Sequence, residues 1–266
     1  MKIALLIHEE YDFTFPMLRD LLPRLSGPHE VRGVLAFPDV LGRYCGLAIP
    51  LEYLRRFGPG VVLGLARRSL SHRAALLLRW VDRREPAFTF AGLCTARSVP
   101  FRRFRNPNDP EVCDWLEHNQ VDVGLIFIGH IMGERVLGTV RECFLNKHSS
   151  LLPFSRGLFP VFWTLMEGAP VGATIHKVAA RLDAGEIILQ KRYDADPGAS
   201  VYDWYRRIFG DAPEMVMRSL ALLPTGERVR VPHALPPGYH SLPRRQAVIA
   251  GRQDWVEFRR LGLRFV

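Results

Sequence analysis

A short apolar run at the start of the chain constrains the fold most. From Lys2 to His8 the sequence is almost continuously apolar, which is typical of a parallel β-strand that is covered on both faces. A segment with helical apolar spacing follows from Phe13 to Leu25, and Glu30–Phe37 predicts a second strand. A strand, a helix and a strand in this order predict an α/β protein with a doubly wound, mostly parallel twisted sheet.

The rest of the chain continues the alternation of strands and helices. The run from Asp122 to His130 predicts a central strand that ends at a glycine, and ligands of open α/β sheets bind where such strands end at their carboxyl side. A third strand is predicted at Phe88–Leu93, and two later strands are predicted at Gly172–Val178 and Glu186–Arg192. Helices are predicted at 109–118, 133–142, 159–167 and 201–223.

Composition bounds the class of protein. The 266 residues are 48% apolar with a mean hydropathy of zero, as in a soluble globular protein of one domain, or of one domain with a short appendage. No apolar run approaches the roughly 20 residues that cross a bilayer, and the first apolar run is too short for a signal peptide, so a cytoplasmic protein is expected. The four cysteines, at positions 45, 94, 113 and 143, lack the spacing of a zinc site or a disulfide framework. No metal site is therefore predicted.

Residues 40 to 85 interrupt the regular pattern and carry most of the positive charge. Nine arginines stand against three acidic residues in this stretch, while the whole chain has a net charge of +9. Between Val61 and Trp80 the leucines have the spacing of a helix with one apolar stripe. A basic, solvated helix packed on the domain is the favoured interpretation. A lid over an anionic substrate, or a surface that docks on a membrane or an acidic partner, is the alternative.

The chemistry of the chain is predicted to centre on Asn146 and His148. They follow the apolar residues 143–145 and are two positions apart, so on a strand they project from the same face. Acyl transfer to an amine needs a hydrogen-bond donor for the oxyanion, a base for the amine proton, and a carboxylate that orients the base. Asn146, His148 and Asp183, which lies in a predicted turn between two strands, supply these three groups. Taken alone, an Asn-x-His pair is more often structural than catalytic.

The surrounding sequence is more specific than these three side chains. From Asn146 to Gln190 the chain resembles the core of the formyltransferase family that uses N10-formyltetrahydrofolate. The matching segments are Asn146-x-His148, Ser150-Leu151-Leu152-Pro153, Arg156-Gly157, Gly172-Ala173-Thr174-Ile175-His176 and Leu182-Asp183-Ala184-Gly185-Glu186-Ile187. The resemblance extends more loosely over about residues 86 to 225. Within the family, the stretch from Gly157 to Trp163 is most similar to the sugar N-formyltransferases.

The resemblance implies a Rossmann-type catalytic domain over residues 1–225, which contains the insertion at about 40–85, and a short C-terminal extension over 226–266. It also implies N10-formyltetrahydrofolate as the formyl donor and catalytic roles for Asn146, His148 and Asp183. The predicted folate-binding residues are Ile128, Gly129, His130, Ile131, Met132 and Asp183. The predicted acceptor-binding residues are Arg156, Phe159 and Trp163, although a position in the core is the favoured interpretation of Trp163. For His176, a structural hydrogen-bonding role is favoured over that of a second base.

The resemblance implies a small, anionic amine as acceptor, and a nucleotide-linked amino sugar is favoured. Candidate partners for its negative charge are Arg43, Arg55, Arg56, Arg102, Arg103 and Arg105. Another small amine, such as an amino acid or a natural-product precursor, is the first alternative. A formyltetrahydrofolate hydrolase and a catalytically silent folate-binding protein are alternatives of other classes.

Two branches of the family are disfavoured by what the sequence lacks. The loop after the first strand has no glycine-rich phosphate loop of the kind found in the glycinamide ribonucleotide branch. The tail of about 40 residues is shorter than the C-terminal barrel of the initiator-tRNA formyltransferases. No nucleic-acid partner is therefore predicted. The oligomeric state is open, with a homodimer as one alternative.

Overall fold

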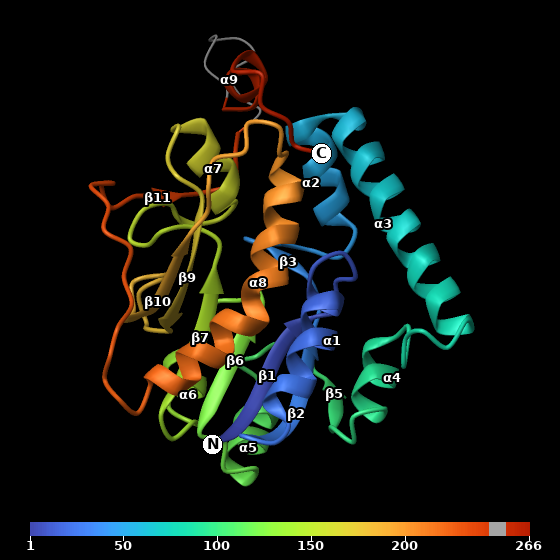
Figure 1. The fold of residues 1–266 in the computed structure, drawn as a ribbon, viewed down its shortest axis with the longest axis vertical. Helices are drawn as coiled ribbons and strands as arrows, with labels where there is room; N and C mark the ends of the chain where they lie inside the picture. The colour runs from blue at the N-terminus through green and yellow to red at the C-terminus, as the bar shows by residue number, and fades with distance from the viewer. Residues whose placement is uncertain (245–253) are drawn as a thin grey trace.

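The computed structural model describes residues 1–244 and 254–266, and its centre is a seven-stranded sheet (Figure 1). The strands stand in the order β10-β9-β7-β6-β1-β2-β5. Their bounds are β1 Lys2–His8, β2 Glu30–Phe37, β5 Phe101–Arg103, β6 Val123–Phe127, β7 Cys143–His148, β9 Gly172–Lys177 and β10 Ile187–Arg192. The pairs from β7 to β5 are parallel, whereas β9 pairs antiparallel with both β7 and β10. The predicted doubly wound, mostly parallel sheet is confirmed.

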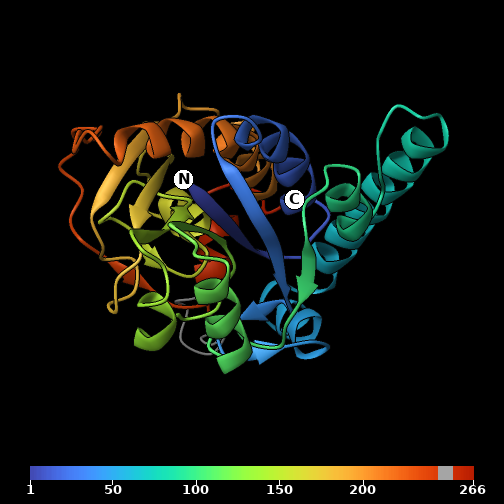
Figure 2. The ribbon, with the colours of Figure 1, turned by 90° about the horizontal axis from the view of Figure 1, so that it is seen from below.

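Helices cover both faces of the sheet (Figure 2). Two of them, α1 and α8, lie against each other on one face, and α5 and α6 lie on the other. Their bounds are α1 Thr14–Leu25, α5 Pro110–His118, α6 Glu134–Leu137 and α8 Val201–Leu222. Alternate residues of β1 belong to two separate cores, one under α1 and α8 and one under α5. Burial of both faces is why this strand is apolar without interruption.

The order of the strands reverses between β1 and β6, so the carboxyl ends of these two strands form the switch point of the sheet. Helix α1 leads from β1 to β2 on one face, while α5 leads into β6 across the opposite face. Such a switch point is where ligands bind in open α/β sheets. Here His8, the last residue of β1, accepts a hydrogen bond from the N–H of Gly129 at 2.7 Å, and its Nδ1 lies 3.0 Å from Asp39 Oδ1. The two strand ends are thereby held together at the switch point.

Two predicted elements differ from the structure. Phe88–Leu93 was predicted as a strand, and this is wrong, because helix α4 (Phe90–Thr95) begins there. The hydroxyl of Thr89 accepts a hydrogen bond from a backbone N–H of the first turn at 3.0 Å and so caps the helix. The sheet position is filled by β5 instead. The helix predicted over 133–142 is also too long, because α6 ends after one turn at Gly138, a weak helix former.

The basic insertion forms a small hairpin and two helices beside the sheet. These elements are β3 Val40–Leu41, β4 Tyr44–Cys45, α2 Ala48–Phe57 and α3 Pro59–Val81. The helix predicted between Val61 and Trp80 is confirmed as α3, which stands at the side of the molecule (Figures 1 and 2). Phe57 at the end of α2 is buried against Phe159 and Phe265. The insertion therefore shares the core of the domain.

The C-terminal segment lies against β10 and the loops that follow β7. Val229 exchanges backbone hydrogen bonds with Ile188 and Gln190 of β10. Its later elements are β11 Tyr239–His240, which pairs in parallel with β8 Arg156–Gly157, and α9 Asp254–Arg260, which contacts α7 Pro160–Met166. Of the predicted extension 226–266, residues 245–253 lie outside the described residues.

Candidate active site

Strand β7 carries Asn146 and His148 to the carboxyl edge of the sheet. Strand β9 runs antiparallel to it, with His176 opposite Asn146 and Thr174 opposite His148. Side chains two positions apart share a face. All four residues therefore project to the side of Phe144, whose ring belongs to the core under α5. The pairing of the two strands places one amide next to two imidazoles.

Asp183 reaches the same place from the connection between β9 and β10. Its backbone is in the left-handed region, with φ at 47°, and its Oδ2 accepts a hydrogen bond from the N–H of Gly157 at 2.9 Å. The carboxylate lies between two imidazoles, with Oδ2 3.6 Å from His148 Nδ1 and Oδ1 3.6 Å from His176 Nε2. The side chains of Asp183, His148 and His176 are 7%, 7% and 2% exposed. The structure thus brings Asn146, His148 and Asp183 together and adds His176.

The second contact of His148 determines where its ring carries hydrogen. Nε2 lies 2.9 Å from the carbonyl oxygen of Ser155, which only accepts, so Nε2 donates. In the neutral ring the lone pair is then on Nδ1, which faces Asp183. A proton taken up at Nδ1 is stabilised by the Asp183 carboxylate, while Nε2 keeps its bond to Ser155. His148 therefore has the geometry of a base whose charged form finds a partner on each nitrogen.

His176 orients the amide of Asn146. Its Nδ1 donates to the Lys177 carbonyl at 2.8 Å, so Nε2 accepts, and Asn146 Nδ2 is 3.3 Å away. Burial and the nearby His148 lower the pKa of His176 to about 4, which keeps the ring neutral at neutral pH. One N–H of Asn146 is thus engaged, and the other is free to donate toward an oxyanion. His176 is absent from the predicted site residues, although its register opposite Asn146 is a signal that could have placed it there.

The predicted folate-binding stretch follows β6 at the switch point of the sheet. Ile131 is 69% exposed, whereas Met132 is only 7% exposed and belongs to the core under α5. The ring of His130 stacks on His8 with centroids 5.3 Å apart, and burial lowers the pKa of His130 to about 4. Asn108, which sequence reasoning missed, donates to the Ile131 carbonyl at 2.9 Å and accepts a backbone N–H two residues later at 2.6 Å. The exposed residues of the stretch are therefore Gly129 and Ile131, and Asn108 holds the carbonyl of Ile131 in place.

The three predicted acceptor-binding residues each have a partner within the protein. Arg156 Nε donates to the Gly238 carbonyl at 3.3 Å. Phe159 is 8% exposed and packs against aromatic side chains of α2. Trp163 Nε1 donates to a backbone carbonyl of the C-terminal segment at 3.0 Å, and its ring stacks on His240. These side chains connect the loop after β7 to the insertion and to the C-terminal segment.

Glu10 fills the N-terminus of α1 with a carboxylate of the chain itself. Its side chain accepts hydrogen bonds from the N–H groups of Phe13 at 2.8 Å and Thr14 at 3.1 Å. Free N–H groups at a helix N-terminus are a usual site for an external phosphate. Here the carboxyl group of Glu10 already occupies them, which accounts in structural terms for the missing glycine-rich loop.

Glu10→Gln is expected to make the stability of the protein less sensitive to mild alkali. Burial raises the pKa of Glu10 from 4.5 to about 7, so its contribution to stability is present below the unfolded value and is lost as the pH rises through the folded value. From about pH 5 to about pH 8, the thermal midpoint of the variant should fall by a few degrees less than that of the wild type. Glu117→Gln, at an exposed position of α5, is the control. An equal difference at both pH values for Glu10→Gln would contradict the assignment.

Lys147, between Asn146 and His148, points to the opposite face of the sheet. Its Nζ lies 3.3 Å from the ring centroid of Phe209 and donates to Ser149 Oγ at 3.0 Å. Burial lowers the pKa of Lys147 well below the ordinary value. The free energy of unfolding that depends on neutral Lys147 is therefore present above the pKa of the unfolded chain, and it is lost as the pH falls.

A double variant, Lys147→Met with Ser149→Ala, is expected to remove that loss without leaving a buried hydroxyl unpaired. Its thermal midpoint should exceed that of the wild type by several degrees at neutral pH and by less at about pH 10. Thermal unfolding followed by circular dichroism checks this. A gain that is independent of pH would show that Lys147 is charged in the folded protein.

Within residues 1–244 and 254–266, no group of three or more His, Cys, Asp or Glu side chains is placed to hold a metal ion. In the same part of the chain, no helix combines the length and the apolar character that crossing a membrane requires.

The fold is similar to that of solved structures. It matches glycinamide ribonucleotide transformylase 1 from Symbiobacterium toebii over 87% of this chain and 94% of that chain, with a TM-score of 0.57 and 19% identity. It matches a sugar N-formyltransferase from Shewanella sp. FDAARGOS_354 over 97% of this chain and 86% of that chain, with a TM-score of 0.55 and 13% identity. At these identities the likeness concerns the fold alone.

Similarity in sequence is more specific. The methionyl-tRNA formyltransferase of Thermotoga maritima is 36% identical over 130 residues, which are 48% of this chain and 42% of that protein. The chain thus spans less than half the length of this relative. The family model described as formyl transferase matches residues 82–220, just over half of the chain, and this range includes Asn146, His148 and Asp183. The chain belongs to the formyl transferase family.

Proposed function

We propose that the protein is an N-formyltransferase that takes a formyl group from N10-formyltetrahydrofolate and gives it to the primary amine of a small acceptor. The observation that carries the proposal is the meeting of Asn146, His148 and Asp183 at the end of β7. They supply an oxyanion donor, a base and a carboxylate, which acyl transfer to an amine needs. Membership of the formyl transferase family supports the identity of the transferred group.

Each side chain then has one task. As the amine nitrogen bonds to the formyl carbon, the formyl oxygen gains negative charge and accepts a hydrogen bond from the free N–H of Asn146. His148 Nδ1 takes the proton that the amine nitrogen loses, and Asp183 stabilises the resulting imidazolium. The bond from the formyl carbon to N10 breaks, and N10 receives the proton from His148. The products are a formamide and tetrahydrofolate, and His148 is neutral again.

The donor is proposed to bind at the switch point of the sheet, beside the stretch that follows β6. Asn108 binds the carbonyl of Ile131 and the N–H of Gly133, and His8 binds the N–H of Gly129, so this stretch has a defined backbone conformation against which a pterin ring can bind. The exposed side chain of Ile131 offers an apolar contact beside this backbone. Small-molecule sites commonly combine an apolar wall with a few fixed polar groups.

The proposed acceptor is a nucleotide-linked amino sugar. The stretch from Gly157 to Trp163 is similar to the sugar N-formyltransferases, and the structural match to one of them covers 97% of this chain. Glu10 supports this choice, because it occupies the helix N-terminus where a glycinamide ribonucleotide phosphate could otherwise bind. The competitor is methionyl-tRNA, since a methionyl-tRNA formyltransferase is 36% identical over 130 residues.

The arginines proposed for the acceptor's charge are not equally available. Arg55 and Arg56 both pair with Glu52, at 3.2 and 3.0 Å, and Arg103 pairs with Glu9 at 2.5 Å. The other candidates are Arg43, Arg102 and Arg105. We therefore propose that the acceptor's phosphates bind to Arg43, Arg102 or Arg105.

The test is a thermal-shift panel followed by an activity assay. Nucleotide-linked amino sugars are added with and without a folate analogue that cannot transfer its formyl group. Stabilisation that needs both ligands identifies the ternary complex, and formation of a formamide on the same sugar confirms it. Formylation of methionyl-tRNA but of no sugar would show that the proposed acceptor is wrong. Release of formate without any amine would show that the protein is a hydrolase and not a transferase.

A further inference from the structure

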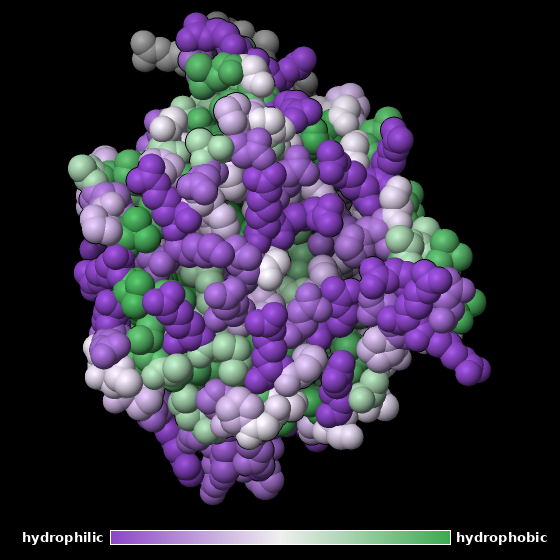
Figure 3. All heavy atoms as spheres, in the orientation of Figure 1, coloured by the Kyte–Doolittle hydropathy of each residue, from purple (hydrophilic) through white to green (hydrophobic). Residues whose placement is uncertain are grey.

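The outer face of helix α3 is apolar and exposed. In this 23-residue helix only Val61 and Leu76 are buried. The exposed large apolar side chains are Leu63 at 72%, Leu70 at 69%, Leu77 at 44%, Leu78 at 65%, Trp80 at 41% and Val81 at 62%. The hydropathy view shows apolar atoms along the edge of the molecule where α3 runs (Figure 3). The stripe that the leucine spacing predicts therefore faces outward instead of packing on the domain.

The periodicity of the helix explains this arrangement. Leu63, Leu70 and Leu77 follow one another at seven-residue intervals, which is about two helical turns, so they share one face. Val61 and Leu76 lie roughly opposite them around the helix at 3.6 residues per turn. Helix α3 thus has two apolar faces, and one of them is enough to attach it to the domain.

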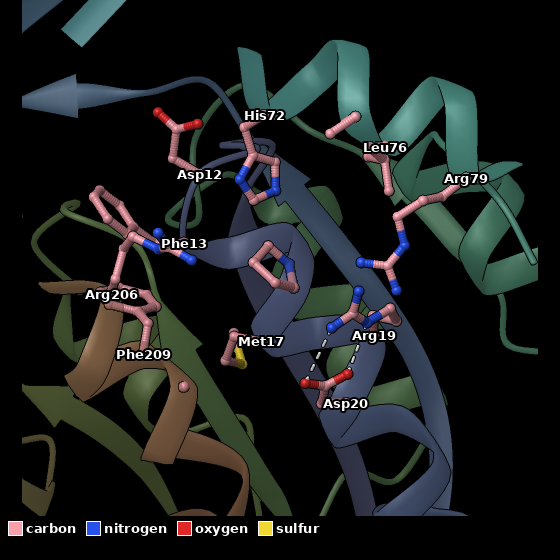
Figure 4. Close-up of a pocket in the computed structure, with 13 residues that line it drawn as sticks. Asp12, Phe13, Met17, Arg19, Asp20, His72, Leu76, Arg79, Arg206 and Phe209 are labelled. Atoms are coloured by element: carbon pink, nitrogen blue, oxygen red, sulfur yellow. Dashed lines mark hydrogen bonds and ion pairs between the residues drawn. The ribbon is translucent and has the colours of Figure 1, made fainter. Parts of the chain in front are cut away.

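Ion pairs help to attach the inner face of α3 to the domain. A cavity of about 370 Å³ lies between α1, α3 and α8, with His72 and Leu76 of α3 in its wall (Figure 4). Arg19 of α1 and Arg79 of α3 point toward each other there, and both bind the same carboxylate oxygen of Glu85, at 2.9 and 2.8 Å. Since Glu85 holds the two helices together, the outer leucines are not needed for this attachment.

The charge of α3 decides which partner fits the outer face. The helix contains four arginines and no Asp or Glu, and two more arginines follow at positions 83 and 84. Arg68, Arg73 and Arg79 contact Asp203, Tyr11 and Glu85 of the domain. The exposed charge beside the outer face therefore comes from Arg67, Arg83 and Arg84, and a second copy paired through α3 would offer these three no carboxylate of the helix. An anionic lipid surface offers an apolar layer for the leucines and phosphates for Arg67, Arg83 and Arg84.

We propose that α3 docks on the surface of a membrane that contains anionic lipids. Its outer leucines enter the boundary between headgroups and acyl chains, and its arginines extend to the lipid phosphates. The helix lies in the plane of the surface and does not cross the bilayer. This association is independent of the formyl-transfer proposal and adds a location for the protein.

The first test is flotation of the full chain with lipid vesicles. Vesicles of phosphatidylcholine with phosphatidylglycerol should carry the protein, and vesicles of phosphatidylcholine alone should carry at least about tenfold less. High salt should weaken the arginine contribution. Equal flotation with both kinds of vesicle, or none with either, would overturn the proposal.

Two sets of variants, each with its own control set, separate the contribution of the leucines from that of the arginines. Leu63→Ser, Leu70→Ser and Leu77→Ser, combined, should reduce flotation at least about tenfold, whereas Val256→Ser with Leu261→Ser, at 49% and 52% exposure on or beside α9, should not. Arg67→Glu, Arg83→Glu and Arg84→Glu should act like the leucine set. The same charge change at the exposed Arg24, Arg97 and Arg218 should have a smaller effect.

Light scattering after size exclusion tests the competing occupant. Wild type and both α3 variant sets should have the same mass without lipid, and their far-ultraviolet circular dichroism should agree because the changed side chains are exposed. A wild-type dimer that the leucine variants convert to a monomer would assign the face to a second copy and would refute membrane docking.

Discussion

His148→Ala is expected to lower kcat/KM for formyl transfer by at least about 100-fold, the usual scale for a lost proton-transfer group. The imidazole is the base in the proposed reaction, and its Nδ1 is the atom that lies 3.6 Å from Asp183. Asp183→Asn should cause a loss of similar size, because the uncharged amide no longer stabilises the imidazolium. This replacement keeps an oxygen for the N–H of Gly157, so the loop should retain its conformation.

Steady-state rates of both variants, with His118→Ala as an exposed control on α5, check this prediction. Equal thermal midpoints would show that the loss is chemical and not a consequence of unfolding. A rate within about twofold of wild type in either catalytic variant would contradict the assignment of its side chain, since the expected loss is so much larger.

Asn146→Ala is expected to lower kcat by about 100- to 1,000-fold and to change KM much less, as removal of an oxyanion donor does. Asn146→Asp should be at least as damaging, because it keeps the shape but puts a negative charge where the formyl oxygen becomes negative. His176→Leu should have a smaller effect, about tenfold in kcat, because it leaves the donor present and removes only the atom that orients it.

The pH dependence of kcat separates positioning from proton transfer. With a pKa lowered to about 4, His176 does not titrate near neutral pH, so His176→Leu should leave the acidic limb of the profile where it is in the wild type. A shift of that limb would identify His176 as a base in its own right. An unchanged kcat in Asn146→Ala would show that Asn146 is not the oxyanion donor.

The sequence predicts the sheet and the catalytic strand well for a physical reason. The apolar runs at β1 and β6 exist because both faces of these strands are buried. The two-residue spacing of Asn146 and His148 places both side chains on one face once the strand forms. Asp183 lies in the connection between β9 and β10, so no strand periodicity relates it to β7.

The parts that the sequence did not predict depend on single contacts. The segment before α4 has a strand-like composition, yet one hydroxyl of Thr89 caps a helix there. Strands β8 and β11 have two residues each and are far apart in the chain, so neither periodicity nor propensity indicates their pairing. This pairing bears on function, because β8 includes Gly157, whose N–H binds Asp183.

The stripe on α3 shows the limit of periodicity. Spacing predicts the helix and its apolar face, but not whether that face packs on the domain or remains exposed. The helix has a second apolar side with Val61 and Leu76, and it is this side that packs on the domain.

Single-turnover transfer of an isotopically labelled formyl group tests the central claim most directly. Enzyme in excess is mixed with labelled N10-formyltetrahydrofolate and an amine acceptor found in the binding panel, and the label is followed to its product. We predict that the wild type moves the label to the amine nitrogen and releases little as formate, and that His148→Ala and Asn146→Ala leave it on the donor over the same time. Label that appears as formate whether or not amine is present, or that reaches the amine equally fast in the variants, would contradict the account.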